Sequence, residues 1–212
     1  LIKKGELTFM IKGLSKRVLS KTEAFGLKRD LDINFSAPKA QIDISMRPFK
    51  PEDAAHFTMD LQNAGLVEKA IPTCYVAKTI EGMPCYRHWL MDAQQNIKIQ
   101  EFWGQAFPTL NTDEALIESV FTIPQYRGQG IMPEALDKMA EVAKDLNVRW
   151  LMLFVETDNI ASLKGSHRSG FSPYVLRTEK WILFKRRIVF EDVPKHMMDT
   201  YLRKVMNSNI RD

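Results

Sequence analysis

The sequence predicts an α/β fold, in which strands and helices alternate along the chain. Three elements follow one another in the middle of the chain: an apolar strand over 114–123, a glycine-containing loop over 125–130 and an amphipathic helix over about 132–146. A short apolar run over 149–155 follows and has the length of a buried strand. The 212 residues, 45% of them hydrophobic, suffice for one substantial core plus an appendage.

Four elements are expected before the central strand. Residues 41–47 alternate polar and apolar side chains, as a half-buried strand does. Pro51 opens a helix that we expect to end near residue 63. Residues 74–91 predict a β-hairpin, because two apolar runs flank a short turn with a glycine. A further strand is expected over 97–102. Near the carboxyl end, residues 180–190 predict one or two strands with a basic turn, and residues 192–207 predict a helix.

The loop over 125–130 reads Gln-Tyr-Arg-Gly-Gln-Gly and predicts a phosphate-binding site. A strand, a glycine loop and a helix start in this order point free backbone N–H groups at a phosphate. The glycines let the main chain approach the anion without a Cβ atom in the way. Pro133 fits the first helical turn, where its missing N–H costs little.

Two common phosphate-binding motifs do not match this loop. A P-loop needs Gly-Lys-Ser or Gly-Lys-Thr, whereas Gly130 is followed by Ile131 and Met132. A dinucleotide fingerprint needs a third glycine, and Pro133 stands in its place. The pattern that remains is Q-x-x-G-x-G.

With this pattern the sequence resembles the GNAT acetyltransferase superfamily, in which the loop grips the pyrophosphate of acetyl-coenzyme A. A second motif lies at the distance that the family shows: Asn159, Ser162, Gly170 and Phe171. The resemblance covers about residues 115–172 and extends more loosely over 42–190. It implies a mixed sheet with helices on both faces. We therefore expect a basic N-terminal extension over 1–40, a GNAT acyltransferase domain over 41–190 and a C-terminal helix over 191–212.

The resemblance also implies the cosubstrate and the residues that bind it. The cosubstrate is acetyl-CoA or another acyl-CoA, and an amine attacks its thioester directly, with no covalent enzyme intermediate. In the family two central strands splay apart, so that the pantetheine arm pairs with backbone groups of the first. The expected cofactor-binding residues are Phe121, Thr122, Ile123, Gln125, Arg127, Gly128, Gln129, Gly130, Ile131, Asn159 and Ser162.

Four residues are considered for the proton transfers. Glu118 lies on the strand that enters the loop, where the family often places the base; it could equally be an ordinary outward-facing strand glutamate. Ser166 stands where the family often has a tyrosine that protonates the leaving thiolate. Either another group, such as His167 or Tyr174, supplies that proton, or no protein acid does. A thiol with a pKa near about 8.5 leaves readily as thiolate.

The net charge of +4 is unevenly distributed. Residues 1–29 hold eight basic and two acidic residues, so the rest of the chain is slightly acidic and nucleic acid is not an expected partner. Val18 and Phe25 belong to apolar positions at helical spacing in this arm, which predicts a helix, or an extended arm, packed on its own domain or on a second subunit of a homodimer. A basic surface helix that contacts acidic lipid, nucleic acid or a charged partner is the alternative.

The sequence as a whole predicts an acyl-CoA-dependent N-acetyltransferase that acts on a small-molecule, amino-sugar or peptide amine. No transmembrane segment or secretory signal is expected, so we expect a cytoplasmic protein. The histidines and the two cysteines lack metal-ligand spacing, so no metal site is expected. The alternative function is a catalytically silent acyl-CoA-binding module that docks through its basic arm.

Overall fold

The computed structural model describes residues 17–58, 66 and 73–206. Within this part of the chain, eight strands form one mixed sheet in the order β2-β3-β4-β5-β6-β1-β7-β8. The strands are β1 (Leu19–Asp30), β2 (Ile44–Pro48), β3 (Cys74–Thr79), β4 (Pro84–Asp92), β5 (Glu114–Thr122), β6 (Trp150–Glu156), β7 (Ser172–Ile182) and β8 (Lys185–Glu191). The α-helices are α3 (Asn96–Trp103), α4 (Ile131–Asp145), α5 (Ile160–Arg168) and α6 (Lys195–Met206). The 3₁₀ segments are η1 (Pro51–Phe57), η2 (Ala93–Gln95), η3 (Gly104–Ala106) and η4 (Pro124–Tyr126).

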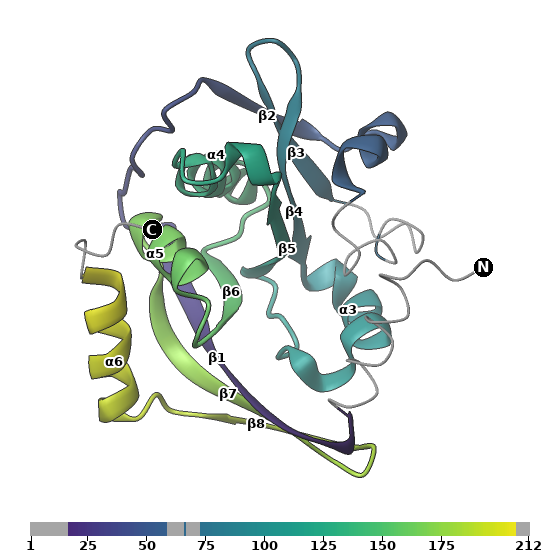
Figure 1. Ribbon diagram of the computed structural model, residues 1–212, viewed down its shortest axis with the longest axis vertical. Helices are drawn as coiled ribbons and strands as arrows, with labels where there is room; N and C mark the ends of the chain where they lie inside the picture. Colours follow the sequence, from purple (N-terminus) through teal and green to yellow (C-terminus); the bar gives the residue numbers. More distant parts are fainter. Residues whose placement is uncertain (1–16, 59–65, 67–72, 207–212) are drawn as a thin grey trace.

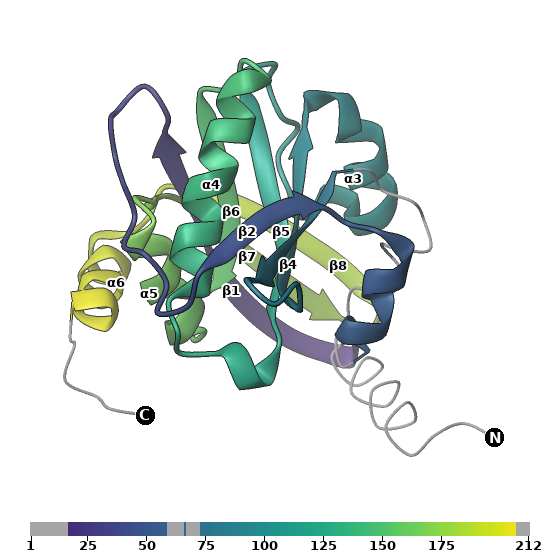
Figure 2. The same cartoon turned by 90° about the horizontal axis from the view of Figure 1, so that it is seen from above.

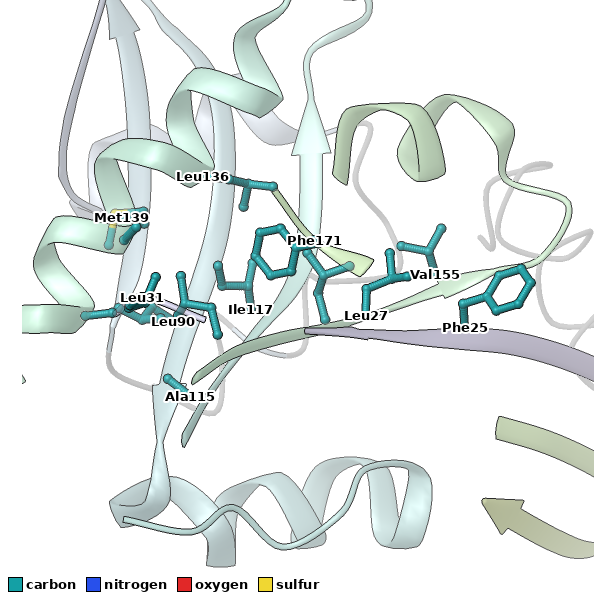
Figure 3. Packing of buried hydrophobic residues seen from close by; sticks show 14 of the residues in the cluster. Phe25, Leu27, Leu31, Leu90, Ala115, Ile117, Leu136, Met139, Val155 and Phe171 are labelled. Atoms are coloured by element: carbon teal, nitrogen blue, oxygen red, sulfur yellow. The ribbon is translucent and has the colours of Figure 1, made fainter. Parts of the chain in front are cut away.

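Helices cover both faces of this sheet. Figure 1 shows α4 and α5 on one side of the strands and α3 on the other, and Figure 2 shows the same arrangement from above. The first hydrophobic cluster packs α4 against the strands, with Leu136 above Ile117, and Met139 above Leu31 and Leu90 (Figure 3). The second cluster packs α3 against the opposite face, with Ile99 against Trp89 and neighbouring residues. The predicted mixed α/β fold is therefore confirmed.

The hairpin prediction for residues 74–91 is confirmed by β3 and β4. These strands pair antiparallel, and Gly82 has a φ of 85° in the turn between them, a conformation that glycine adopts without strain. The predicted strand over 41–47 corresponds to β2, which pairs with β3. Pro51 opens a 3₁₀ segment, η1; the rest of the helix expected to residue 63 lies largely outside the described residues.

Of the two conformations expected for the arm around Val18 and Phe25, residues 19–30 adopt the extended one and form strand β1. Arg17 and Val18 are helical, and the part of the expected helix before them lies outside the described residues. The strand lies between β6 and β7 and is antiparallel to both. Phe25 and Leu27 are fully buried and belong to the same hydrophobic cluster, so the apolar positions also fit a period of two. A short apolar pattern is compatible with either period, and pairing on both edges selects the strand. Residues 19–30, within the expected N-terminal extension, thus contribute a strand to the interior of the sheet.

The strand expected over 97–102 is also wrong, because these residues form helix α3. Ile97 is 72% exposed and Ile99 is 1% exposed, so the alternation does not reflect two faces of a strand. The Asn96 side chain holds the next loop by accepting from the Leu110 N–H and donating to its carbonyl, each at 2.9 Å. Asp92 caps the preceding turn by accepting from the Gln94 N–H at 2.8 Å. These local hydrogen bonds favour helix over extended chain.

The later elements agree with their predictions except for the basic turn, which is wrong: the turn consists of Leu183 and Phe184, and Lys185, Arg186 and Arg187 belong to strand β8. Helices α4 and α6 and strand β6 lie where the sequence places them, and β7 and β8 pair across a two-residue turn. Tyr201 of α6 is buried against Phe25, with ring centroids 5.4 Å apart in an edge-to-face arrangement. This contact fixes the C-terminal helix to strand β1.

Candidate functional site

Strands β5 and β6 are parallel neighbours that separate halfway along their length. They pair only where Glu114–Leu116 faces Trp150–Met152. Beyond this point the strands diverge and enclose a cavity of about 410 Å³. The cavity is lined by Ile117, Glu118, Ser119, Val120, Met132, Leu153, Phe154, Val155, Glu156, Asn159 and Ser162. The divergence exposes one edge of β5 to this space.

A β-bulge turns β5 at the start of the divergence. The register with β4 shifts between Arg87 and Trp89, so Ser119 and Val120 together face His88. Ser119 has a φ of 57°, in the left-handed region that residues other than glycine rarely adopt. Bulges bend a strand and redirect its side chains, and they are frequent beside active sites. The bulge therefore turns the carboxyl half of β5 away from β6.

Glu118 immediately precedes the bulge and lines the cavity. Its side chain is on the α3 face of the sheet, because it is two residues from Leu116, which belongs to the cluster under α3. Burial raises the pKa of Glu118 to about 7, although a backbone hydrogen bond at Ser119 and the charge of Arg177 lower it. Near neutral pH this carboxyl group is therefore able both to accept and to donate a proton.

The positive charge of Arg177 lowers the pKa of Glu118 and so partly opposes the effect of burial. Arg177 is on β7, and its Nη1 donates to the Ala106 carbonyl at 2.9 Å. Its guanidinium lies 5.1 Å from the ring centroid of Phe154 and 5.4 Å from that of Phe107. These contacts hold a positive charge beside the cavity and connect β7 to the segment after α3.

The glycine loop and the start of α4 form a second cavity of about 500 Å³. Gly128 and Gly130 have φ angles of 77° and 74°, which an L-residue adopts only with strain. The first N–H groups of a helix have no partner inside it. In α4 these belong to Ile131 and Met132, because Pro133 has none. They supply the N–H groups that an anion requires.

Three cations line this second cavity, and no acidic residue does. They are Arg127 in the loop, and Lys164 and Arg168 one turn apart on α5. Arg127 is held by its Nε, which donates to the Thr122 carbonyl at 3.1 Å. A cavity with this charge, bounded by a helix N-terminus, is complementary to a group that carries several negative charges, such as a diphosphate.

A short segment before β2 supports the loop from behind. Gln41 donates its N–H to the Gln129 carbonyl at 2.8 Å, and Ala40 donates its N–H to the Glu134 carboxylate at 2.7 Å. Glu134 is buried in the first turn of α4 and also lies 3.4 Å from the ammonium of Lys138. Contacts with residues distant in sequence thus support the glycine loop, whose φ angles its own glycines permit.

The family model of GNAT acetyltransferases matches residues 70–171, which contain both cavities. Residues 70–171 belong to the GNAT acetyltransferase family. The family is one of acyl-CoA-dependent acyltransferases. Among curated protein sequences, none matches the chain significantly.

Solved structures of GNAT proteins share the fold of the chain. The N-acetyltransferase region of a fungal multi-domain β-N-acetylglucosaminidase, described as a glucosamine N-acetyltransferase, aligns with a TM-score of 0.57 and 13% identity over 84% of this chain and 23% of that one. A GNAT protein of Sphaerobacter thermophilus aligns with a TM-score of 0.51 and 16% identity over 82% of this chain and 57% of that one. An acetyltransferase of Colwellia psychrerythraea aligns with a TM-score of 0.50 and 14% identity over 90% of this chain and 63% of that one. The chain spans less than two thirds of the length of each.

Most of the cofactor-binding residues predicted for the GNAT domain line the second cavity. They are Phe121, Thr122, Arg127, Gly128, Gly130, Ile131, Asn159 and Ser162. Ile123 does not, because its side chain is buried and its N–H donates to the Cys85 carbonyl at 3.0 Å. Gln125 and Gln129 also lie outside the lining; the Gln129 amide donates to the Gln125 carbonyl at 3.3 Å.

Asn159 and Ser162 lie where the two cavities meet. The Asn159 side-chain oxygen accepts from the Ser162 N–H at 3.2 Å and so caps helix α5. This bond occupies the oxygen and leaves the amide NH₂ group as the donor of this side chain. Both residues line both cavities, as do Val120 and Met132.

The other three residues considered for proton transfer lie outside the lining of the cavities. Ser166 is fully buried, and its hydroxyl donates to the Ser162 carbonyl at 2.8 Å. The Nδ1 atom of His167 lies 3.3 Å from the hydroxyl oxygen of Tyr201, on the side of α5 that faces α6. The hydroxyl of Tyr174 donates to the sulfur of Met152 at 3.3 Å. None of the three lines either cavity.

Several residues of the site were not found from the sequence. Lys164 and Arg168 carry a local signal, because they are four residues apart in a helix that begins at the family's asparagine. Arg177 carries none, since its proximity to Glu118 depends on the order of strands in the sheet. Of the aromatic residues on α3 and its neighbours, Phe107 packs on Phe154 with ring centroids 5.4 Å apart, and Phe154 itself lines the cavity.

No helix among the described residues is both long and apolar enough to span a bilayer.

Proposed function

We propose that the chain is an N-acyltransferase that uses acetyl-CoA or another acyl-CoA as cosubstrate and a primary amine as acceptor. The observation that carries this proposal is the continuity of the two cavities. They share Val120, Met132, Asn159 and Ser162, so a ligand held by its phosphates at α4 extends into the space beside Glu118. In this proposal the phosphates of the cosubstrate bind at one end of a single groove, and the proton acceptor lies at the other end.

The diphosphate of the cosubstrate would bind at the start of α4. The N–H groups of Ile131 and Met132 and the charges of Arg127, Lys164 and Arg168 support this assignment. The glycines at 128 and 130 allow the main chain to approach the phosphates.

The pantetheine arm would run along the exposed edge of β5. Ile123 donates its N–H to β4, and consecutive residues of a strand direct their N–H groups to opposite edges. The N–H of Thr122 is therefore directed to the side where β6 has diverged. The Asn159 amide, at the junction of the cavities, is placed to hold an amide of the same arm.

In the proposed reaction the amine nitrogen forms a bond with the thioester carbonyl carbon, and the carbon–sulfur bond breaks. Glu118 accepts a proton from the ammonium form of the acceptor, directly or through water. A pKa of about 7 leaves a substantial fraction of Glu118 ionised at neutral pH. An N–H of β5 beside the bulge would face the carbonyl oxygen as negative charge develops.

No protein acid is assigned to the leaving thiolate. The hydroxyl of Ser166 is engaged with the Ser162 carbonyl, and His167 faces α6. A thiol with a pKa of about 8.5 leaves as thiolate near neutral pH without one. Replacing Ser166 with alanine is accordingly expected to leave kcat largely unchanged.

The proposal is tested by calorimetry with CoA and acetyl-CoA, followed by thiol release from acetyl-CoA across a panel of amino sugars, polyamines, amino acids and peptides. Binding of acetyl-CoA with turnover on at least one class of amine supports the proposal. Binding with no turnover on any amine supports the silent acyl-CoA-binding module instead. Absence of binding by the folded protein contradicts both.

A further inference from the structure

The turn between β7 and β8 carries two bulky apolar residues in a strained conformation. Leu183 and Phe184 have φ angles of 46° and 66°. Two-residue hairpin turns with positive φ at both positions strongly favour Asn-Gly, because L-residues with large side chains are strained there. The turn persists because the N–H groups of Leu183 and Phe184 donate to the carbonyls of Val18 and Arg17, both at 2.8 Å. Strain held in place in this way is characteristic of functional positions.

The same residues form an exposed apolar tip. Ile182, Leu183 and Phe184 are 57%, 72% and 58% exposed. The tip lies at a corner of the molecule, far from α4 and α5, where the β7–β8 turn projects in Figure 1. Three consecutive exposed apolar side chains on a projecting turn contribute nothing to the core. Asn-Gly would be both more soluble and less strained, so the fold does not require the residues that are present.

Cations surround this tip. Lys180, Lys185 and Arg187 are exposed on the two strands, and Arg17 lies with its guanidinium 5.7 Å from the ring centroid of Trp181. Lys180 faces Arg187, and Ile182 faces Lys185, across the hairpin. Arg186 is excluded from this set, because it donates to the Glu179 carboxylate and the Trp103 carbonyl, both at 2.8 Å. The remaining cations favour an anionic partner.

We propose that the β7–β8 turn docks the protein on a membrane surface that contains anionic lipid. Ile182, Leu183 and Phe184 enter the boundary between headgroups and acyl chains, and Lys180, Lys185 and Arg187 lie beside the lipid phosphates. Trp181 is at the level where aromatic rings are enriched in membrane-bound proteins. A second copy of this chain fits less well, because a symmetric contact would bring these cations against one another.

This inference is independent of the proposed acyltransfer. The turn contributes no residue to either cavity of the groove. Membrane docking can therefore fail while acyltransfer is retained, and acyltransfer can fail while docking is retained.

The test is co-sedimentation of the full chain with vesicles of phosphatidylcholine alone and of phosphatidylcholine mixed with phosphatidylserine. The wild type is expected to bind the mixed vesicles and to be released by salt, because surface electrostatics are screened. The double variant Leu183→Asn, Phe184→Gly removes the apolar tip and supplies a favourable turn sequence. It is expected to bind at least about tenfold more weakly and to melt at a higher temperature than the wild type. A melting temperature that does not fall shows that lost binding is not caused by misfolding.

The matched control is Ile80→Asn, on the β3–β4 turn. Ile80 is 80% exposed and adjoins another hairpin turn, but it lies in the other half of the sheet. Its replacement is expected to leave vesicle binding unchanged, and replacing Lys180, Lys185 and Arg187 together with glutamine is expected to abolish the preference for anionic vesicles. Wild-type protein that binds neither kind of vesicle overturns the inference. So does binding that survives the double variant, or lipid-free self-association that the double variant abolishes, since the turn would then be a subunit contact.

Discussion

Glu118 lies opposite Trp89 in the β4–β5 register, at the last paired position before the bulge formed by Ser119 and Val120. Trp89 is 1% exposed and packs under α3, so it fixes this position of the sheet rigidly. The bulge then turns the following residues toward the gap between β5 and β6. The carboxylate is thereby held at the inner end of the groove, on a paired strand and not on a loop.

The pH dependence of turnover should report the ionisation of Glu118. Because burial raises the pKa of this group to about 7, kcat/KM is expected to rise with pH through about 7. Glu118→Gln is expected to lower kcat by about 100-fold or more, to preserve acetyl-CoA affinity and to flatten this part of the profile. A profile that keeps its midpoint in the variant would remove Glu118 as the base.

The ionisation of Glu118, which should raise turnover as pH rises, should also lower the stability of the fold. A carboxyl group whose folded pKa lies above its unfolded value is protonated in the folded state while already ionised in the unfolded chain. Its contribution to stability is therefore lost as pH rises from about 4.5 to about 7. Glu118→Gln is expected to melt at a higher temperature than the wild type above pH 7, with a smaller difference at pH 5. Thermal melts in matched buffers measure this, and an equal shift at both pH values would contradict it.

Gly128 offers a test of the proposed phosphate binding by the glycine loop, with a matched control. Gly128 and Gly82 have φ angles of 77° and 85°, and no atom lies within 4 Å of a Cβ built on either. Valine at either position should lower the free energy of unfolding by a similar amount, because the strain of a positive φ is similar at the two positions. Only Gly128→Val places a side chain in the cavity and is expected to abolish acetyl-CoA binding in calorimetry. Equal affinity of the two variants would show that the loop does not bind the cosubstrate.

The pairing of Arg29 with Asp137 should stabilise the attachment of β1 to α4. Arg29 is 4% exposed, and its Nη2 donates to the Asp137 carboxylate at 2.9 Å and to the Phe35 carbonyl at 3.2 Å. Asp137→Asn is expected to lower the free energy of unfolding by about 3 kcal/mol, because it leaves a buried cation without its carboxylate. Arg29→Met, which removes the buried charge, should cost less. Denaturant titrations compare the two, and the reverse order would contradict this account.

Gly26 is required where β1 passes between two side chains. A Cβ at this position would lie 2.5 Å from Cγ1 of Val175 and 2.8 Å from Cε1 of Phe154. Gly26→Ala is expected to destabilise the fold by about 1–3 kcal/mol. Val175→Ala added to Gly26→Ala should recover part of this loss, because it removes the nearer methyl group. Strict additivity of the two substitutions would show that the contact is relieved elsewhere.

Much of the groove could be predicted from the sequence because its signals are local. The φ angles of Gly128 and Gly130, and the helix that begins at Ile131, depend on residues within one or two turns. The capping role of Asn159 is local as well. The same local reading was wrong over 97–102, where alternating apolar residues belong to helix α3. Around Phe25 it left a helix and an extended arm open, and the helical spacing there belongs to strand β1. Short apolar patterns fit both periods, so only packing distinguishes them.

By itself, the sequence determined the glycine loop, the strand and helix on either side of it, and the candidacy of Glu118. The reason is that near neighbours favour particular backbone conformations at glycine, proline and capping residues. The tertiary structure decided that β1 lies between β6 and β7, that β5 and β6 diverge, and that Arg177 lies beside Glu118. It also showed that Ser166 and His167 face away from the groove. Those facts depend on pairing between segments far apart in the chain, whose free energy comes from burial and hydrogen bonding that no local pattern records.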